Sequence, residues 1–66
     1  MHLTINGQAR DVSDSLNVAQ LLDELQLDPQ RVAVEHNRAI VAREEFGSRK
    51  LHNGDTLEIV QFVGGG

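Results

Sequence analysis

The feature that most constrains the fold is a short amphipathic segment near the middle of the first half of the chain. Val18, Leu21, Leu22 and Leu25 recur at the i, i+3, i+4 and i+7 spacing of one helical face. A helix of roughly ten residues is too short to be stable in water alone. Its apolar stripe must therefore pack on a sheet built from the rest of the chain.

Both ends of this helix are marked by residue type. Asn17 is a favourable N-cap, and Gln20 three residues later completes a capping box. Pro29 disfavours helical geometry in the residue before it, so the helix must end by Asp28.

Short extended runs supply the expected sheet. Asn6-Gly7 favours a tight β-hairpin because both residues tolerate positive φ, and Asn37-Arg38 and Asn53-Gly54-Asp55 mark two further turns. The expected strands, in chain order, are 2–5, 8–12, 31–36, 39–41 and 56–63, with a charged irregular stretch at 42–53 that Phe46 and Leu51 anchor in the core. The order predicts one α+β domain over residues 1–63, a mixed sheet with the helix across one face.

Composition excludes several classes of function. The net charge is −4 and Lys50 is the only lysine, whereas nucleic-acid binding needs clustered basic residues. No cysteine is present for disulfides or thiolate metal sites, and no apolar run is long enough for a signal peptide or a membrane span. We expect a cytoplasmic protein that binds neither nucleic acid nor membrane.

Few side chains are candidates for catalysis or metal binding. His2, His36 and His52 are far apart in the sequence and lack companion ligands, so we expect no metal site. Glu44-Glu45 and Asp23-Glu24 are most simply solvated faces, because a domain this small rarely encloses a pocket. We interpret Arg31, Arg38, Arg43 and Arg49 in the same way, with ion pairs to acidic groups of a partner as the alternative. We expect no catalytic residue.

The chain ends in Gly64-Gly65-Gly66, directly after the last expected strand. Glycine lacks Cβ and lets the backbone pass through narrow places. We expect residues 64–66 to form a flexible tail that is threaded through a partner's channel and presents the carboxylate of Gly66. A glycine-rich end is also typical of an inert, disordered terminus, which is the alternative.

The carboxylate of Gly66 is ionised at neutral pH and is a poor acyl donor. It can attack the α-phosphate of ATP in a partner enzyme where a metal and cationic groups offset the charge. The resulting acyl-adenylate is a good acyl donor. A sulfur nucleophile can then displace AMP and leave a thiocarboxylate on Gly66.

The last strand also predicts a docking patch. Along it Leu57 and Ile59 alternate with Val60 and Phe62. If Leu57 and Ile59 face the helix, Val60 and Phe62 lie on the open face beside the tail, where they can dock the adenylating partner. The alternative is that Phe62 packs on a loop of the same chain.

The sequence resembles the ThiS family, the sulfur carriers of thiamine biosynthesis, over essentially its whole length. The residues that carry the resemblance are Ile5-Asn6-Gly7, Val32-Ala33-Val34-Glu35-His36-Asn37, Ile40-Val41, Asn53-Gly54-Asp55 and Leu57-Glu58-Ile59-Val60-Gln61-Phe62-Val63-Gly64-Gly65-Gly66. One departure is Ala42, between Val41 and Arg43, where the family often has proline.

The resemblance implies a ubiquitin-like β-grasp fold and a loading cycle. A ubiquitin-activating-like adenylyltransferase would use ATP and magnesium to adenylate Gly66, with Gly65 as its diglycine partner. A persulfide donor, such as a cysteine desulfurase system, would supply the sulfur of the thiocarboxylate. Thiazole synthase would then take this sulfur for the thiazole of thiamine. The carrier would be a co-substrate with no bound cofactor, and not an enzyme.

Three alternatives remain open at this point. The small subunit of molybdopterin synthase shares this fold and tail but usually has prolines before the diglycine, whereas Gln61-Phe62-Val63 has none. A ubiquitin-like modifier would instead be joined through Gly66 to lysine amines. A plain interaction domain would leave the tail inert.

Overall fold

The computed structural model of the chain describes residues 1–63. Gly64, Gly65 and Gly66, on which the prediction of a flexible, threaded tail falls, lie outside the described residues. The elements, in chain order, are β1 (His2–Ile5), β2 (Gln8–Asp11), α1 (Val18–Glu24), the 3₁₀ turn η1 (Pro29–Arg31), β3 (Val32–His36), β4 (Ala39–Val41), the 3₁₀ turn η2 (Arg43–Glu45) and β5 (Thr56–Gln61).

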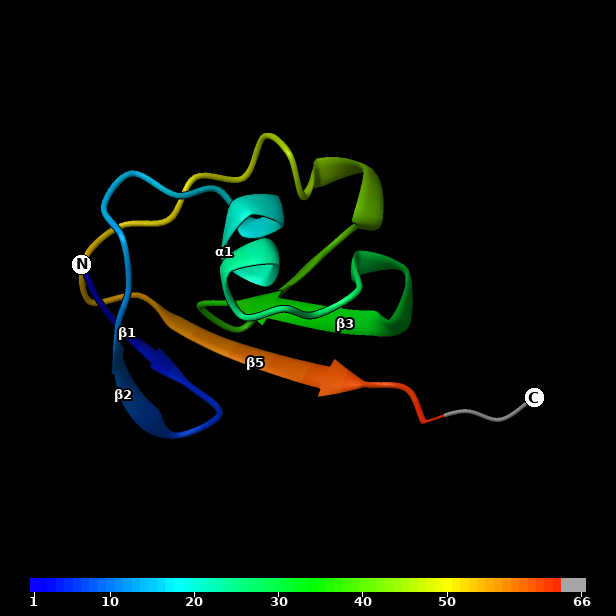
Figure 1. The fold of residues 1–66 in the computed structure, drawn as a ribbon, viewed down its shortest axis with the longest axis horizontal. Coiled ribbons are helices and arrows are strands. Elements are labelled where there is room, and N and C mark those ends of the chain that lie inside the picture. The colour runs from blue at the N-terminus through cyan, green and yellow to red at the C-terminus, as the bar shows by residue number, and fades with distance from the viewer. Residues whose placement is uncertain (64–66) are drawn as a thin grey trace.

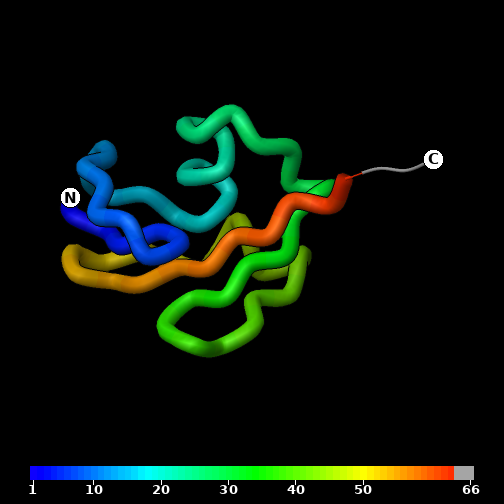
Figure 2. The backbone as a smooth tube through the Cα atoms, turned by 90° about the horizontal axis from the view of Figure 1, so that it is seen from below, coloured from blue at the N-terminus to red at the C-terminus, as the bar shows by residue number. Residues whose placement is uncertain are grey.

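The strands form one mixed sheet in the order β2-β1-β5-β3-β4. The central strand β5 runs parallel to β1 and antiparallel to β3. Figure 1 shows α1 crossing over one face of this sheet, and Figure 2 shows β5 (orange) lying between β1 (blue) and β3 (green). The predicted α+β architecture, a β-grasp with one main helix, is confirmed.

The core lies between α1 and the sheet and is almost entirely aliphatic. Of the stripe predicted for the helix, Val18, Leu21 and Leu22 have 0% of their surface exposed. Its fourth member, Leu25, is the C-cap residue of α1 and packs partly buried against the core. The other buried apolar residues are Leu3, Ile5, Val32, Val34, Val41, Phe46, Leu51, Leu57 and Ile59. Phe46 and Leu51 anchor the loop between β4 and β5, as the sequence predicted.

The predicted capping box begins α1. The backbone N–H of Gln20 donates to Oδ1 of Asn17 at 2.7 Å, and the N–H of Asn17 donates to Oε1 of Gln20 at 2.9 Å. Both bonds satisfy donors that the first helical turn leaves free. They therefore fix the residue at which the helix begins.

The helix is shorter than the roughly ten residues expected from the sequence. It ends at Glu24 after seven residues, because Gln26 adopts a left-handed φ of 59°. The N–H of Leu27 then donates to the carbonyl of Leu22 at 2.8 Å, which is the closing bond of a Schellman motif. Pro29 does not end the helix and instead opens η1.

The last strand also stops earlier than the sequence predicted, at Gln61 and not at Val63. A strand continues only as far as a neighbour accepts its hydrogen bonds. Gln61 pairs with Val32, the first residue of β3. Within residues 1–63, the N–H of Phe62 still has a backbone acceptor beyond Gln61, the carbonyl of Arg31 at 2.7 Å.

The start of β5 is fixed by a polar cluster around Asp55. Nε2 of His36 lies 2.6 Å from Oδ2 of Asp55, and both side chains are largely buried. The N–H of His52 and the amide of Asn37 donate to the same carboxylate at 2.8 and 3.1 Å. Burial acts to raise the pKa of Asp55, but the hydrogen bonds from His36, His52 and Asn37 outweigh it, so the pKa is lowered.

This cluster was not visible in the sequence, where His36 and His52 were considered only as metal ligands. His36 belongs to β3, His52 to the loop, and Asn37 to the turn before β4. The side chain of Asn37 also accepts the N–H of Thr56, the first residue of β5, at 2.9 Å. The cluster therefore ties the β3–β4 turn to the point where the central strand begins.

We expect Asp55→Asn to lower the free energy of unfolding at pH 7 by about 1–3 kcal/mol, because it weakens several hydrogen bonds of buried groups. A lowered folded-state pKa contributes stability above the unfolded value of about 3.8, and this contribution is lost as the pH falls through the folded value. Urea unfolding from pH 7 down to pH 2 should therefore show a smaller acid-induced loss in the variant.

Asp23→Asn is the matched control, since Asp23 is exposed on α1 and changes the charge equally. An Asp55→Asn protein with the wild-type loss of stability below pH 4 would contradict this role of the carboxylate.

Candidate functional site

The candidate site is the end of β5, from which the chain continues towards the predicted reactive residue. Gly66, the predicted site of modification, and Gly64 and Gly65, predicted to be threaded, lie outside the described residues. Figure 1 shows the end of β5 and the N-terminus at opposite ends of the molecule. The geometry available for this site is therefore that of the base of the tail and of the surface around it.

Asn6 holds β5 beyond the point where β1 ends. Asn6 has a φ of 51° in the tight turn before β2. Its side-chain amide donates to the carbonyl of Ile59 at 3.0 Å, and its Oδ1 accepts the N–H of Ile59 at 2.7 Å. The side chain thus replaces one backbone residue of a neighbouring strand. The sequence predicted the turn at Asn6-Gly7 but not this second role of Asn6.

Arg43 braces the other side of the base of the tail. Its Nε donates to the carbonyl of Pro29 at 2.9 Å, and its Nη2 donates to the carbonyl of Val32 at 3.0 Å. These bonds hold η1 in place, and η1 ends in Arg31, whose carbonyl accepts the N–H of Phe62. Arg43 is exposed, as the sequence predicted, but its two hydrogen bonds to the backbone were not predicted.

Ala42, noted in the sequence as a departure from the resemblance, precedes Arg43 but gave no signal for these two contacts. Ala42 adopts a φ of −65°, which is the value that proline imposes. Ala42 thus holds the backbone as proline would, in the conformation from which Arg43 reaches its two carbonyls.

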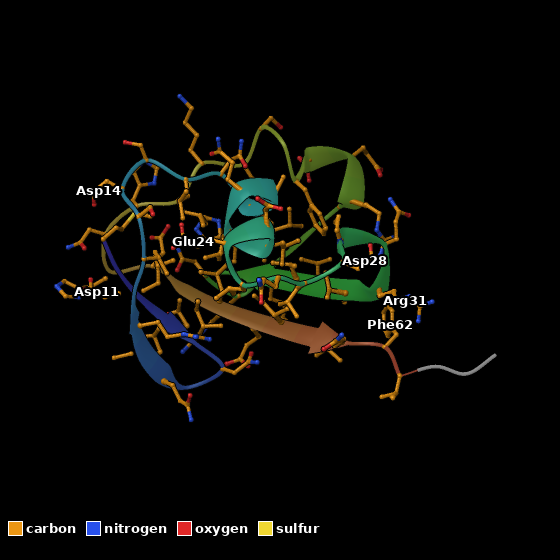
Figure 3. All side chains as sticks on the ribbon, viewed as in Figure 1. Asp11, Asp14, Glu24, Asp28, Arg31 and Phe62 are labelled. Carbon is orange, nitrogen blue, oxygen red and sulfur yellow. The ribbon has the colours of Figure 1, made fainter. Side chains whose placement is uncertain are left out.

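The alternation predicted for β5 is present. Leu57 and Ile59 face the core with 0% and 7% of their surface exposed, whereas Val60 and Phe62 are 59% and 54% exposed. Figure 3 shows the side chain of Phe62 beside Arg31 at the start of β3. Both predicted docking residues are thus accessible at the base of the tail, and their docking role stays a prediction.

Val60 borders a shallow hollow of about 140 Å³ on the face of the sheet opposite α1. The hollow is lined by Ala33, Val34, Glu35, Ile40, Glu58 and Val60. Ile40 in β4 is 80% exposed, which is unusual for a large aliphatic residue within a sheet. Ile40 was predicted to lie in a strand but not in this surface, although its alternation with Val41 was a signal for an exposed side chain.

Charges at the opposite end of the molecule are internally paired. The Met1 ammonium lies 2.8 Å from Oδ1 of Asp14 and 3.9 Å from Oδ1 of Asp11. Its hydrogen bond with Asp14 raises the pKa of the amino group and lowers that of the carboxyl. Hydrogen bonds from Ser13 lower the pKa of Glu24. Figure 3 shows these three carboxylates far from Phe62.

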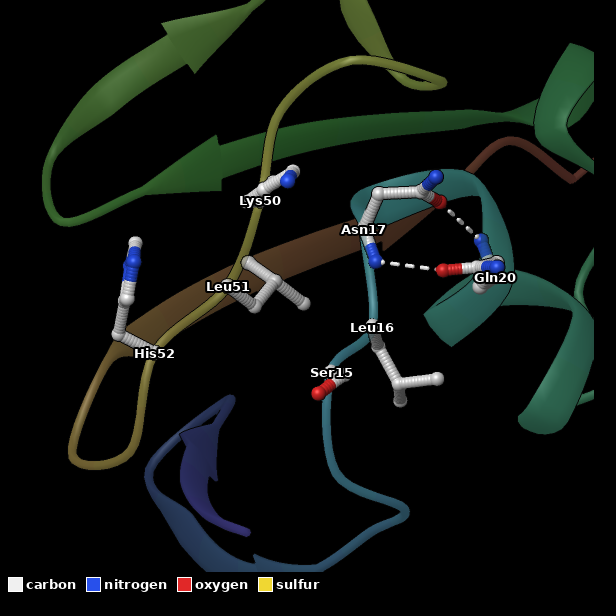
Figure 4. A pocket seen from close by; sticks show the side chains of 7 residues that line it. All are labelled: Ser15, Leu16, Asn17, Gln20, Lys50, Leu51 and His52. Atoms are coloured by element: carbon white, nitrogen blue, oxygen red, sulfur yellow. Dashed lines mark hydrogen bonds between the residues drawn. The ribbon is translucent and has the colours of Figure 1, made fainter.

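A second hollow, of about 260 Å³, lies at the start of α1 (Figure 4). Its lining residues are Ser15, Leu16, Asn17, Gln20, Lys50, Leu51 and His52. The most directional polar groups there, those of Asn17 and Gln20, are used by the capping box drawn as dashed lines. These groups are therefore already occupied by bonds within the chain.

Within residues 1–63, no three His, Cys, Asp or Glu side chains gather closely enough to hold a metal ion. The helices of the same part of the chain are all too short or too polar to cross a membrane.

Comparison with known proteins identifies close relatives in sequence and structure. Sulfur carrier protein ThiS of Bacillus subtilis (strain 168) is 39% identical over 97% of this chain and 98% of its own length. The crystal structure of thiamine biosynthesis protein ThiS from Geobacter metallireducens is 39% identical and covers 100% of both chains, with a TM-score of 0.86.

Longer proteins match as well. A thiazole synthase of Paramagnetospirillum magneticum is 47% identical over 100% of this chain, and a thiazole synthase of Magnetococcus marinus is 36% identical over 100% of it. The chain spans about a fifth of the length of each of these two relatives. The profile of the ThiS family matches residues 3–66, from β1 through the last glycine. Because this match covers nearly every residue and agrees with the fold, the chain belongs to the ThiS family.

Proposed function

We propose that this chain is a sulfur carrier that is loaded at the carboxylate of Gly66 and supplies sulfur for the thiazole of thiamine. The observation that carries the proposal is the family match over residues 3–66, which includes the whole glycine tail. The fold supports it, because the central and best-anchored strand of the sheet leads directly to that tail. The chain acts as a co-substrate of its partners.

The loading chemistry follows from the terminal carboxylate. An oxygen of Gly66 attacks the α-phosphorus of ATP, and the bond to pyrophosphate breaks, which gives an acyl-adenylate. A sulfur nucleophile then attacks the acyl carbon and AMP leaves. Where the nucleophile is a persulfide, a thiol must cleave the resulting acyl disulfide. This cleavage forms a new disulfide and releases the thiocarboxylate on Gly66.

Three kinds of protein partner are needed in the cytoplasm for this cycle. A ubiquitin-activating-like adenylyltransferase binds the ATP and magnesium, so the carrier itself needs no bound cofactor. A persulfide donor, such as a cysteine desulfurase system, supplies sulfur. Thiazole synthase accepts it, and this partnership is supported by the two thiazole synthases that contain a segment similar to the whole of this chain.

The proposed tail mechanism depends on the absence of side chains. Gly64 and Gly65 carry no Cβ, so a channel only as wide as a peptide backbone would admit them and exclude other residues. Such a channel would place the carboxylate of Gly66 against ATP and keep water away from the acyl-adenylate.

Intact-mass analysis tests the function directly. The purified chain is mixed with the adenylyltransferase, ATP, magnesium and a sulfur source, and its mass is followed. We expect one oxygen of the C-terminus to be replaced by sulfur. Isopeptide adducts would instead support a ubiquitin-like modifier, and an unchanged mass with an active enzyme would support an inert tail. A subsequent transfer assay with thiazole synthase and with molybdopterin synthase separates the two carrier families.

Addition of one alanine after Gly66 should abolish adenylation, because the wrong carboxylate then reaches the ATP. Pyrophosphate release measures the loss, which should exceed about a hundredfold, as misplaced reacting groups commonly cost. The melting temperature should be unchanged. Normal adenylation of the extended chain would contradict the narrow-channel mechanism.

Phe62→Ala should raise the KM of the carrier for the adenylyltransferase by about fivefold or more, as expected for truncation of an interface residue worth about 1 kcal/mol. Its effect on stability should be small because Phe62 is 54% exposed. Phe46→Ala, at the other phenylalanine and only 4% exposed, is the control and should cost about 3–5 kcal/mol of stability. An unchanged KM for Phe62→Ala would remove Phe62 from the docking surface.

A further inference from the structure

Two carboxylates lie directly opposite one another on the face of the sheet that α1 leaves uncovered. Glu35 of β3 pairs with Glu58 of β5 in the antiparallel register, and both side chains are exposed. Both also line the hollow beside Val60. Like charges directly opposite each other on neighbouring strands destabilise a sheet. The repulsion between Glu35 and Glu58 therefore lowers the stability of the sheet, and neither carboxylate contributes to the core.

Most other acidic side chains of the chain have a local partner. The paired ones are Asp11 and Asp14 at the Met1 ammonium, Glu24 at the N–H of Ser13, Asp28 at the N–H of Gln30, Glu45 near Arg49 and Asp55 at His36. Within residues 1–63, Glu35 and Glu58 make no ion pair or hydrogen bond through their carboxylates, and neither do Asp23 and Glu44. Asp23 and Glu44 stand on separate elements, so only Glu35 and Glu58 form an uncompensated pair.

Aliphatic side chains frame the acidic pair. Ala33 lies opposite Val60, and Ile40 lies opposite Glu35. Val60 and Ile40 are 59% and 80% exposed. The result is two adjacent carboxylates with apolar groups on both sides, in a hollow of about 140 Å³. This arrangement is complementary to a long basic side chain. The methylene groups of such a side chain can contact the aliphatic residues, while its charged end contacts the two carboxylates.

We propose that the Glu35–Glu58 pair docks an arginine or lysine of the adenylyltransferase, a conclusion that rests on the proposed carrier function. The repulsion between the two carboxylates lowers the stability of the free chain. A cation between them removes this repulsion, so its relief contributes to the free energy of binding. Arginine fits best, because its planar fork can donate to both carboxylates at once. The methylene groups of that arginine or lysine contact Ile40, Ala33 and Val60.

Charge complementarity identifies the adenylyltransferase as the occupant. An enzyme that brings the carboxylate of Gly66 next to the triphosphate of ATP must surround its channel with cationic groups. A basic channel mouth attracts an acidic surface at a distance. Val60 lies two residues before Phe62 on the strand that leads to the tail, so the same approach engages both the face and the tail.

The test compares Glu35→Gln/Glu58→Gln with the control Asp23→Asn/Glu44→Gln, which removes the same charge from the two isolated acids. Pyrophosphate release by the adenylyltransferase is measured with ATP and magnesium at low and high salt. We expect the first variant to raise the KM for the carrier by about tenfold at low salt with an unchanged kcat, and the control by less than about twofold. High salt should reduce the difference, because it screens exposed charges.

Thermal unfolding of the same variants provides a readout that a purely structural role would not give. The melting temperature of Glu35→Gln/Glu58→Gln should equal or exceed that of the wild type, because the cross-strand repulsion is gone while binding is weakened.

Equal KM values for the two double variants would overturn the proposal while leaving the carrier function intact. Normal adenylation combined with slower sulfur transfer to thiazole synthase would overturn the assignment of the occupant. Absence of any adenylation of the wild-type chain by an active enzyme would overturn the proposed function, and this proposal with it.

Discussion

The pairing of β5 with β1 on one side and β3 on the other is the constraint on which the rest of the structure depends. Leu57, which is fully buried, pairs with Ile5 of β1 and with His36 of β3. Burial of such a side chain stabilises a fold by about 1.5–3 kcal/mol. The strand is fixed at its start by Asp55 and Asn37 and further along by Asn6. The chain that leaves the sheet at Gln61 therefore starts from the most constrained part of the molecule.

Because side chains alternate along a strand, β5 has core residues on one face and exposed residues on the other. Leu57 and Ile59 belong to the core, while Glu58 and Val60 face away from α1. A register shift of one residue would exchange these two sets of side chains. The double hydrogen bond between Asn6 and Ile59 opposes such a shift, so it protects the core and the exposed face together.

The sequence predicted what short-range chemistry determines. The Asn6-Gly7 hairpin, the Asn17 capping box and the alternation along the last strand all depend on residues within a few positions of one another. The features that the sequence did not predict depend on residues that are farther apart in the chain. The helix ends at Glu24 because Gln26, a residue type that gives no C-cap signal, adopts a left-handed φ, and the last strand ends where β3 begins. Arg43 and the Asp55 cluster bind groups up to 19 residues away, which no local pattern encodes.

A domain of this size has little interior to hold a reactive group, since one helix and five strands bury little more than a single apolar layer. The proposed function accordingly has its chemistry at a chain end, and the further proposal has its specificity on an exposed face. For the open face of the sheet, specificity cannot come from apolar area alone, because Val60, Ile40 and Ala33 offer only a small contact. A pair of uncompensated carboxylates adds direction and partner choice to that contact at the expense of some stability. The repulsion between Glu35 and Glu58 is tolerated because the register that creates it is held by the buried neighbours of both residues on the opposite side of the sheet.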